Sequence, residues 1–204
     1  MKLLIVSASQ RAQSQSAKIA RYIAETSFLQ PHESGYEAIH HLELCQFNLP
    51  FWDGDTDTKG DHWPEISRHV SEADAIILIT PEWGGMASPL LKNFLLMCSA
   101  QDTAHKPALI ISVSSGISGA YPIAEIKMNA LKNNKLIPLP DHLIIRNATE
   151  VLNHELNGAR DKQLRGRIHY SLHMLHQYAG ALAKVRHAHE HQPYPKQQEY
   201  EYGM

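Results

Sequence analysis

Residues 1–20 read MKLLIVSASQRAQSQSAKIA, which is an apolar run, a polar loop and the start of a helix-like pattern. The apolar run at 2–8 lacks the alternation of a half-exposed strand, so it predicts a strand buried on both faces. The runs AIILIT (75–80) and ALIISVS (108–114) have the same character. Strands of this kind favour a parallel sheet that is covered by helices.

Helical patterns separate these runs along the chain. They lie at 14–27, 62–73, 89–100, 120–134 and about 158–187. The more alternating stretch YEAIHHLEL (36–44) is predicted as a second strand, and a last strand is predicted within KLIPLPDHLIIRN (135–147). This order predicts an α/β fold with a doubly wound, five-stranded parallel sheet and helices on both of its faces.

The chain of 204 residues suits one domain with a substantial core, which we predict over residues 1–191. The tail at 192–204, QPYPKQQEYEYGM, has little apolar content to bury and is predicted to be mobile or docked on a partner. The formal net charge of −2 implies no general affinity for polyanions. No basic patch interleaved with aromatic residues indicates nucleic acid, so none is expected as a partner.

The cysteine content and the N-terminal residues bear on the cellular compartment in which the protein is expected. Cys45 and Cys98 are far apart and form no CxxC motif, which fits a reducing environment and gives no zinc or disulfide framework. The N-terminal run MKLLIV is too short for a signal-peptide core or a membrane span. We therefore expect a soluble cytoplasmic protein with no membrane partner.

The loop after the first predicted strand carries many hydrogen-bond donors. A helix start near Ser14 offers backbone N–H groups and the positive end of a helix dipole, which together attract anions. Ser9 and Ser16 add hydroxyls, and Arg11 adds a planar fork that suits phosphate oxygens. Neither GxxxxGK[ST] nor GxGxxG is present, so a monophosphate is the expected ligand. The alternative is that Ser14 only caps the helix and that the other side chains are solvated.

The loops after the next two buried strands are also unusual. In PEWGGMASP (81–89), Gly84 and Gly85 let the backbone approach a ligand, and Trp83 offers a flat face for stacking. SSGISGA (114–120) has small residues and free N–H groups as well. Together these loops predict a site for a planar heterocycle at the carboxyl edge of the sheet. The alternatives are a tight turn with Trp83 capping the core, and an ordinary strand-to-helix turn.

These motifs, in this order, resemble those of the NADPH-dependent FMN reductase family. Its opening GSxRxxSxN is similar to residues 8–16, ASQRAQSQS, and its PEYNxSxPxxLKN to residues 81–93, PEWGGMASPLLKN. Its KPxxxxSxSxGxxGG is similar to Lys106-Pro107 followed by residues 112–120, SVSSGISGA. NLPFWDGD (48–55) resembles the family's LPxYxxD segment. The resemblance spans about residues 1–140 and implies a flavodoxin-like fold.

The resemblance implies a role for each loop. The FMN phosphate would be held by Ser9, Arg11, Ser14 and Ser16. The isoalloxazine would be contacted by Pro81, Glu82, Trp83, Gly84, Gly85 and Met86, with Trp83 in the place of a stacking tyrosine. The other side of the ring would be lined by Ser114, Ser115, Gly116 and Gly119.

By the same resemblance, we expect an FMN-dependent NAD(P)H oxidoreductase that assembles as a homodimer or homotetramer. It would pass a hydride from NADPH or NADH through FMN to a small acceptor: a quinone, an azo or nitro compound, a metal oxyanion or free flavin. No catalytic side chain is required, because the cofactor carries the chemistry. Ala120 and Pro122, which replace a glycine and a frequent arginine of the family, motivate one alternative, an FMN-binding electron carrier or sensor without a nicotinamide site. A second alternative is an interaction protein without flavin.

Two groups of histidines invite comparison with metal sites. One lies on a face of the last predicted helix and the other in HAHEH; they are His169, His173, His176, His187, His189 and His191. Metal ligation needs converging geometry and a supporting second shell, so we expect solvated or interface histidines and no metal. The pair His40 and His41 is expected at the strand surface.

Overall fold

Five parallel strands form one sheet in the order β2-β1-β3-β4-β5. A computed structural model describes residues 1–29 and 35–200 of the chain. Its strands are β1 (Lys2–Ser7), β2 (Ala38–Glu43), β3 (Ala75–Pro81), β4 (Pro107–Val113) and β5 (Ile137–Ile145). This is the flavodoxin-like doubly wound order, so the predicted fold class is confirmed.

Each of the five predicted helical regions contains a helix, and three further short helices lie at 44–46, 56–58 and 197–200, outside the predicted regions. They are α1 (Gln15–Leu29), α3 (Trp63–Glu72), α4 (Pro89–Met97), α5 (Ala100–Thr103), α6 (Ala120–Glu125) and α7 (Gly158–His191), with the short helices η1 (Leu44–Gln46), η2 (Thr56–Thr58), the π-helical η3 (Ile126–Ala130) and η4 (Gln197–Tyr200). The helix predicted at 89–100 divides because Cys98 is extended and the Ser99 hydroxyl accepts the N–H of Gln101 as the cap of α5. Within the described residues, no helix is both long and apolar enough to cross a membrane.

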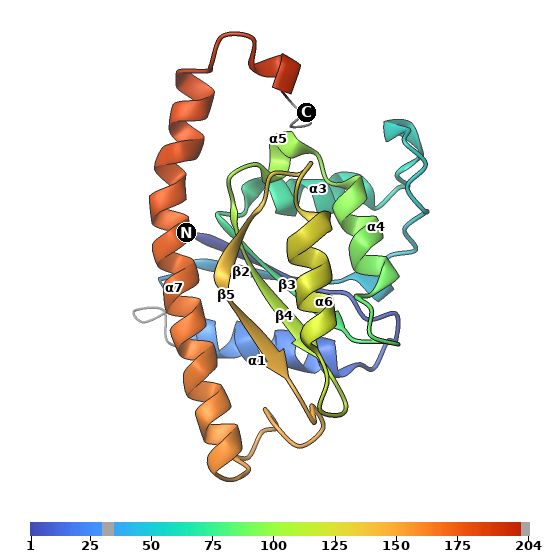
Figure 1. Cartoon of the computed structure of the whole chain (residues 1–204), viewed down its shortest axis with the longest axis vertical. Helices are drawn as coiled ribbons and strands as arrows, with labels where there is room; N and C mark the ends of the chain where they lie inside the picture. The colour runs from blue at the N-terminus through green and yellow to red at the C-terminus, as the bar shows by residue number, and fades with distance from the viewer. Residues whose placement is uncertain (30–34, 201–204) are drawn as a thin grey trace.

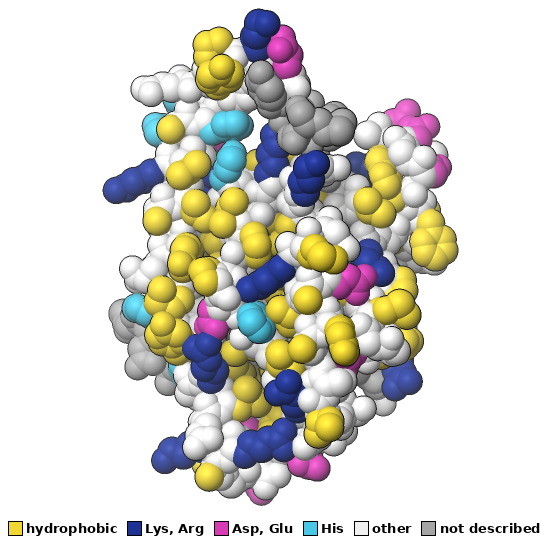
Figure 2. Space-filling view, in the orientation of Figure 1, with side chains coloured by type: hydrophobic (Ala, Val, Ile, Leu, Met, Phe, Trp, Pro, Cys, Tyr) yellow, Lys and Arg dark blue, Asp and Glu magenta, His cyan; other side chains and the backbone are white. Residues whose placement is uncertain are grey.

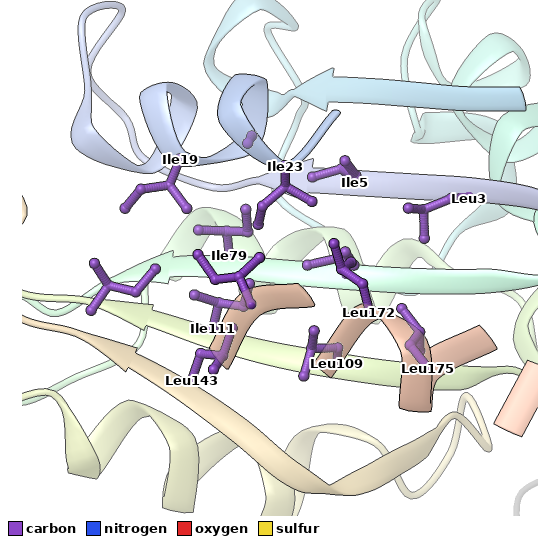
Figure 3. Packing of buried hydrophobic residues seen from close by; sticks show 14 of the residues in the cluster. Leu3, Ile5, Ile19, Ile23, Ile79, Leu109, Ile111, Leu143, Leu172 and Leu175 are labelled. Atoms are coloured by element: carbon purple, nitrogen blue, oxygen red, sulfur yellow. The ribbon is translucent and has the colours of Figure 1, made fainter. Parts of the chain in front are cut away.

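Alternate residues of the central strands point into two separate cores. Helices α1 and α7 cover one face of the sheet, and α3, α4 and α6 cover the other (Figure 1). In β1, Leu3 and Ile5 belong to the first core, whereas Leu4 and Val6 belong to the second. Figure 3 shows part of the first core, with Leu3, Ile5, Ile19, Ile23, Ile79, Leu109, Ile111, Leu143, Leu172 and Leu175 labelled. Burial on both faces explains why these strands lack polar alternation.

The edge strand β5 contains a bulge. Ala108 pairs with Pro138 and Ile110 with His142, so the residues between them leave the ladder. The Lys127 ammonium donates to the carbonyl oxygens of Leu139 at 2.8 Å and Pro140 at 2.9 Å, which replaces part of the lost pairing. Proline is tolerated in strands at edges and bulges, where no N–H is needed. In Figure 2, charged and His side chains interrupt the hydrophobic surface over β5.

The last helix runs along the whole first face and ends at His191, beyond the predicted position 187. Of the tail at 192–204, the structure describes residues up to 200, and residues 201–204 lie outside the described part. The division into a domain at 1–191 and a mobile or partner-docked tail stays a prediction.

A buried carboxylate organises the connection between β5 and α7. Asp161 is fully buried and accepts the N–H groups of Leu152 at 2.9 Å and Asn157 at 3.0 Å, as well as Arg165 Nε at 3.1 Å. Burial by itself would raise the pKa of Asp161, but these donors outweigh it and hold that pKa below its usual value. The carboxylate thereby fixes a loop that follows the carboxyl end of β5.

We predict that Asp161→Ala lowers the free energy of unfolding by about 3–5 kcal/mol, because it leaves buried N–H groups and a guanidinium without their partner. Because the native pKa is lowered, this contribution is present above about pH 4 and is lost as the pH falls further. Urea unfolding at neutral and acid pH measures both effects. The control is Glu150→Ala, which removes an exposed ion pair with Arg160 and should cost less than about 1 kcal/mol. Equal losses in the two variants would contradict the prediction.

Candidate functional site

The three polar loops meet at the carboxyl edge of the sheet. The Arg11 guanidinium, from the loop after β1, lies 4.9 Å from the ring centroid of Trp83 after β3. The Ser118 hydroxyl, from the loop after β4, donates to the carboxylate of Glu82. Segments distant in sequence therefore form one surface, as predicted from the topology.

The first loop combines a helix cap with a second serine hydroxyl, that of the buried Ser9. The Ser14 hydroxyl accepts the N–H of Ala17 at 3.0 Å, so Ser14 does cap α1. The Ser9 hydroxyl accepts the N–H of Arg11 at 3.2 Å. Because both hydroxyls act as acceptors within the loop, each keeps its own O–H to donate to a ligand.

Two buried side-chain atoms where this loop enters α1 have no hydrogen-bond partner among the described residues, Gln15 Oε1 and the Ser16 hydroxyl. The Ser16 hydroxyl is buried in the first turn of α1 and makes no hydrogen bond to the described residues. The first N–H groups of a helix also have no acceptor within the helix. A phosphate monoester supplies several acceptor oxygens and negative charge, so the residues of this loop fit such a group.

The second loop contains a tight hairpin turn built on two glycines. Trp83 N–H donates to the Met86 carbonyl at 3.2 Å, and Met86 N–H donates to the Trp83 carbonyl at 3.0 Å. Gly84 has φ of +58° and Gly85 of +77°, as in a type I′ turn. Trp83 is 40% exposed, so it does not cap the core. Pro81, which is buried, ends the strand before this turn.

Groups from α6 and β3 hold the second loop in place. The Thr80 hydroxyl accepts the N–H of Ser88 at 2.8 Å, and Glu125 accepts the N–H of Ala87 at 2.7 Å. Lys92 Nζ lies 2.8 Å from the same Glu125 carboxylate. Burial would raise the pKa of Glu125, but Lys92 and the Ala87 N–H outweigh it and lower that pKa. Sequence reasoning missed Glu125 because no local motif surrounds it.

The third loop approaches the end of β5 closely. Ser114 N–H donates to the Ile145 carbonyl at 2.9 Å, and Gly116 N–H donates to the Ser114 hydroxyl at 3.3 Å. The Arg146 guanidinium donates to the carbonyls of Ile117 and Ser118, a contact that sequence reasoning also missed. Ser115 is exposed on this loop.

A histidine lies beside the first loop. His41 is half-buried, and its Nε2 lies 2.8 Å from the hydroxyl of Ser7 at the end of β1. Burial, followed by the charges of Arg21 and His40, lowers the pKa of His41 to about 4. His41 therefore lies on the edge strand β2 as a half-buried, hydrogen-bonded residue and is not fully solvated. Among the described residues, no three His, Cys, Asp or Glu side chains are placed to hold a metal ion.

A hollow of about 560 Å³ lies at the opposite, amino-terminal end of the sheet, and its lining includes Pro193 and Gln197 of the tail. Its principal cations have partners within the chain. Lys106 donates to the carbonyls of Val70 and Ser71, and Arg186 pairs with Asp74 at 3.2 Å. Because it lies at the amino-terminal end of the sheet, the hollow is remote from the three loops. The ion pair and hydrogen bonds within the chain largely balance the charges that line it.

The strand order and the loops at the carboxyl edge define a flavodoxin-like α/β protein with a candidate site for a planar ligand that carries a phosphate. The sequence model of one family, NADPH-dependent FMN reductase, matches residues 1–150. The chain belongs to this family. Membership confirms the resemblance noted in the sequence and supports FMN and NAD(P)H as cofactors of an oxidoreductase.

Two curated relatives have related activities in their names. The chain is 27% identical over 120 residues to an NADPH azoreductase of Bacillus sp. (strain OY1-2), which covers 58% of this chain and 62% of that protein. It is 26% identical over 128 residues to an FMN-dependent NADPH-azoreductase of Staphylococcus aureus, covering 63% and 68% of the two chains. The match to the Bacillus protein thus spans less than two thirds of that relative's length.

Two solved structures show the same fold. An oxidoreductase from Corynebacterium diphtheriae superimposes with a TM-score of 0.66 at 17% identity, covering 85% of this chain and 95% of the other. A flavodoxin from the domain Archaea superimposes with a TM-score of 0.52 at 15% identity, covering 85% and 97%. At these identities the likeness concerns the fold.

Gly119 is predicted to be required where the third loop meets β5. A Cβ at Gly119 would lie 2.5 Å from Ile144 Cγ2, and its φ of +111° strains any other residue. Gly119→Ala should lower the free energy of unfolding by about 1–3 kcal/mol. The matched control is Gly116→Ala, because its Cβ would meet open space. Urea unfolding measures both, and an undisturbed Gly119→Ala variant would show that the loop is not constrained there.

Proposed function

We propose that this protein is an FMN-dependent NAD(P)H oxidoreductase that passes a hydride from reduced nicotinamide through FMN to a small acceptor. The observation that carries the proposal is the meeting of three loops with complementary properties. One supplies donors for a phosphate, one supplies a glycine turn beside an exposed indole, and one supplies small residues. The family match over residues 1–150 includes all three loops.

Each loop receives a part in binding. We assign the phosphate to Ser9, Arg11, Ser14 and Ser16. The ring system is assigned to the segment from Pro81 to Met86 on one side and to Ser114, Ser115, Gly116 and Gly119 on the other. Bound FMN supplies hydride acceptance and one- or two-electron transfer, so the chain itself needs no nucleophile. The residues of the chain orient the ring, donate N–H groups to it and leave one face open.

The acceptor class, the location and the assembly also belong to this proposal. We propose a quinone, azo or nitro compound, metal oxyanion or free flavin as the acceptor, a cytoplasmic location and a homodimer or homotetramer. Exposed apolar side chains near the site support contacts with an apolar acceptor or a second subunit: Met86, Ile117 and Tyr121 are 57%, 88% and 71% exposed. Light scattering of the FMN-loaded protein measures the assembly.

The central experiment follows the absorption of FMN-loaded protein under nitrogen while NADPH or NADH is added. We expect the visible absorption of oxidised FMN to bleach and to return when a quinone is added. If FMN stays oxidised with both nucleotides, the alternative of an electron carrier or sensor replaces this function. If the purified protein neither contains nor takes up FMN, the proposal fails.

Arg11→Ala should weaken FMN binding about ten- to a hundredfold, because a charge-assisted hydrogen bond contributes roughly 1.5–3 kcal/mol. The stability of the FMN-free protein should change little, since Arg11 is exposed and its contact with Trp83 is a surface cation–π pair. Fluorescence titration with FMN measures the dissociation constant. Arg21→Ala, which removes a largely exposed arginine of α1 that pairs with Glu43, is the control. An unchanged dissociation constant in Arg11→Ala would remove Arg11 from the phosphate site.

A further inference from the structure

The last turns of α7 bring two histidine rings together on the outer side of the helix. His187 and His191 are both exposed, whereas His189 between them is partly buried. Figure 2 shows His side chains over this C-terminal part of α7. Residues four apart lie on one face of a helix, and the ring centroids of His187 and His191 are 4.0 Å apart. Two imidazoles therefore lie side by side in contact with solvent.

A hydrogen bond determines which nitrogen of His191 can bind a ligand. Its Nδ1 lies 2.9 Å from the backbone carbonyl oxygen of His187. Because a carbonyl oxygen only accepts, Nδ1 carries the proton in this hydrogen bond, and Nε2 keeps its lone pair. Histidines that bind metals in proteins commonly donate their second ring N–H to a backbone carbonyl in this way. The hydrogen bond therefore prepares His191 as a metal ligand.

The turn that carries the pair is attached to the body of the protein. The ring of His189 packs edge-on against that of His105, with 4.9 Å between the centroids. One turn earlier, Arg186 pairs with Asp74 at 3.2 Å. These contacts hold the inner side of the helix, so its outer side presents the two imidazoles from a fixed backbone. The C-terminal end of a helix also favours a bound cation.

Spacing alone does not produce this arrangement. His169 and His173 lie on the same helix with the same separation of four residues. Across the part of the chain that the structure describes, however, no ring contact joins these two side chains. The pair at the end of α7 is therefore the one whose rings already converge.

We propose that His187 and His191 bind one divalent transition-metal ion, Cu²⁺, Ni²⁺ or Zn²⁺, through one imidazole nitrogen each. Imidazole suits these metals, and Cu²⁺ should bind most tightly among them. Water completes the coordination, since no group of three His, Cys, Asp or Glu side chains converges within the described ranges. For this one pair, the proposal departs from the expectation that the histidines bind no metal.

The metal site is independent of the proposed function. His189 of the same turns lines the hollow at the amino-terminal end of the sheet, so the pair is remote from the three loops at the carboxyl edge. A metal ion bound there would neither contact FMN in its proposed site nor require it. Binding of metal and binding of FMN can therefore be measured separately.

The test is calorimetric titration of the full chain, purified without an affinity tag, with NiCl₂. We expect one tight Ni²⁺ site per chain. His187→Ala and His191→Ala should each weaken this binding by about tenfold or more, because one of two ligands is lost. MgCl₂ should show no binding, since Mg²⁺ prefers oxygen ligands.

His169→Ala and His173→Ala are the matched controls, because each removes one histidine from a pair with the same spacing on the same helix. Both should keep the wild-type affinity for Ni²⁺. Absence of Ni²⁺ binding by the wild type, unchanged affinity in His187→Ala and His191→Ala, or equal weakening in the control variants would overturn the inference. None of these results would alter the proposed function, which the reduction of FMN by NADPH or NADH tests.

Discussion

Burial of both faces of a parallel sheet is the constraint on which the rest of this molecule depends. The central strands supply apolar side chains to two cores, and their backbone groups are occupied by the ladder. Polar groups that could bind a ligand therefore lie in the loops at the ends of the strands. The same constraint makes the helices cover the sheet, and the loop that leads into α1 contacts the loop after β3.

The loops at this edge are ordered by a few specific contacts between them. A cation–π pair joins the first loop to the second, and a hydroxyl–carboxylate hydrogen bond joins the second to the third. Two side chains from neighbouring elements support these loops: Glu125 on α6 accepts the N–H of Ala87, and Arg146 after β5 donates to the Ser118 carbonyl. Both residues lie outside the four sequence motifs quoted above.

The positions of the strands, and the loops that meet at the edge of the sheet, could be predicted from the sequence. The individual contacts between those loops could not. Runs such as AIILIT have no polar positions, so their burial and length are evident from composition. The end of α4 at Met97 depends on the extended backbone of Cys98, which no propensity indicates. Three side chains form hydrogen bonds to partners distant in sequence: Glu125, Arg146 and His41. A single amino-acid sequence does not indicate such pairs.

The bulge in β5 has a consequence for the behaviour of the protein in concentrated solution. An open sheet has two edges, and an exposed edge can recruit a strand from another chain. At this edge, Pro138 and Pro140 have no N–H to offer, and the Lys127 ammonium already occupies two carbonyls. A sixth strand would have to displace a positive charge and form an interrupted ladder. The β5 edge of the sheet is thus protected against pairing with other chains into fibres, whether or not a ligand is bound.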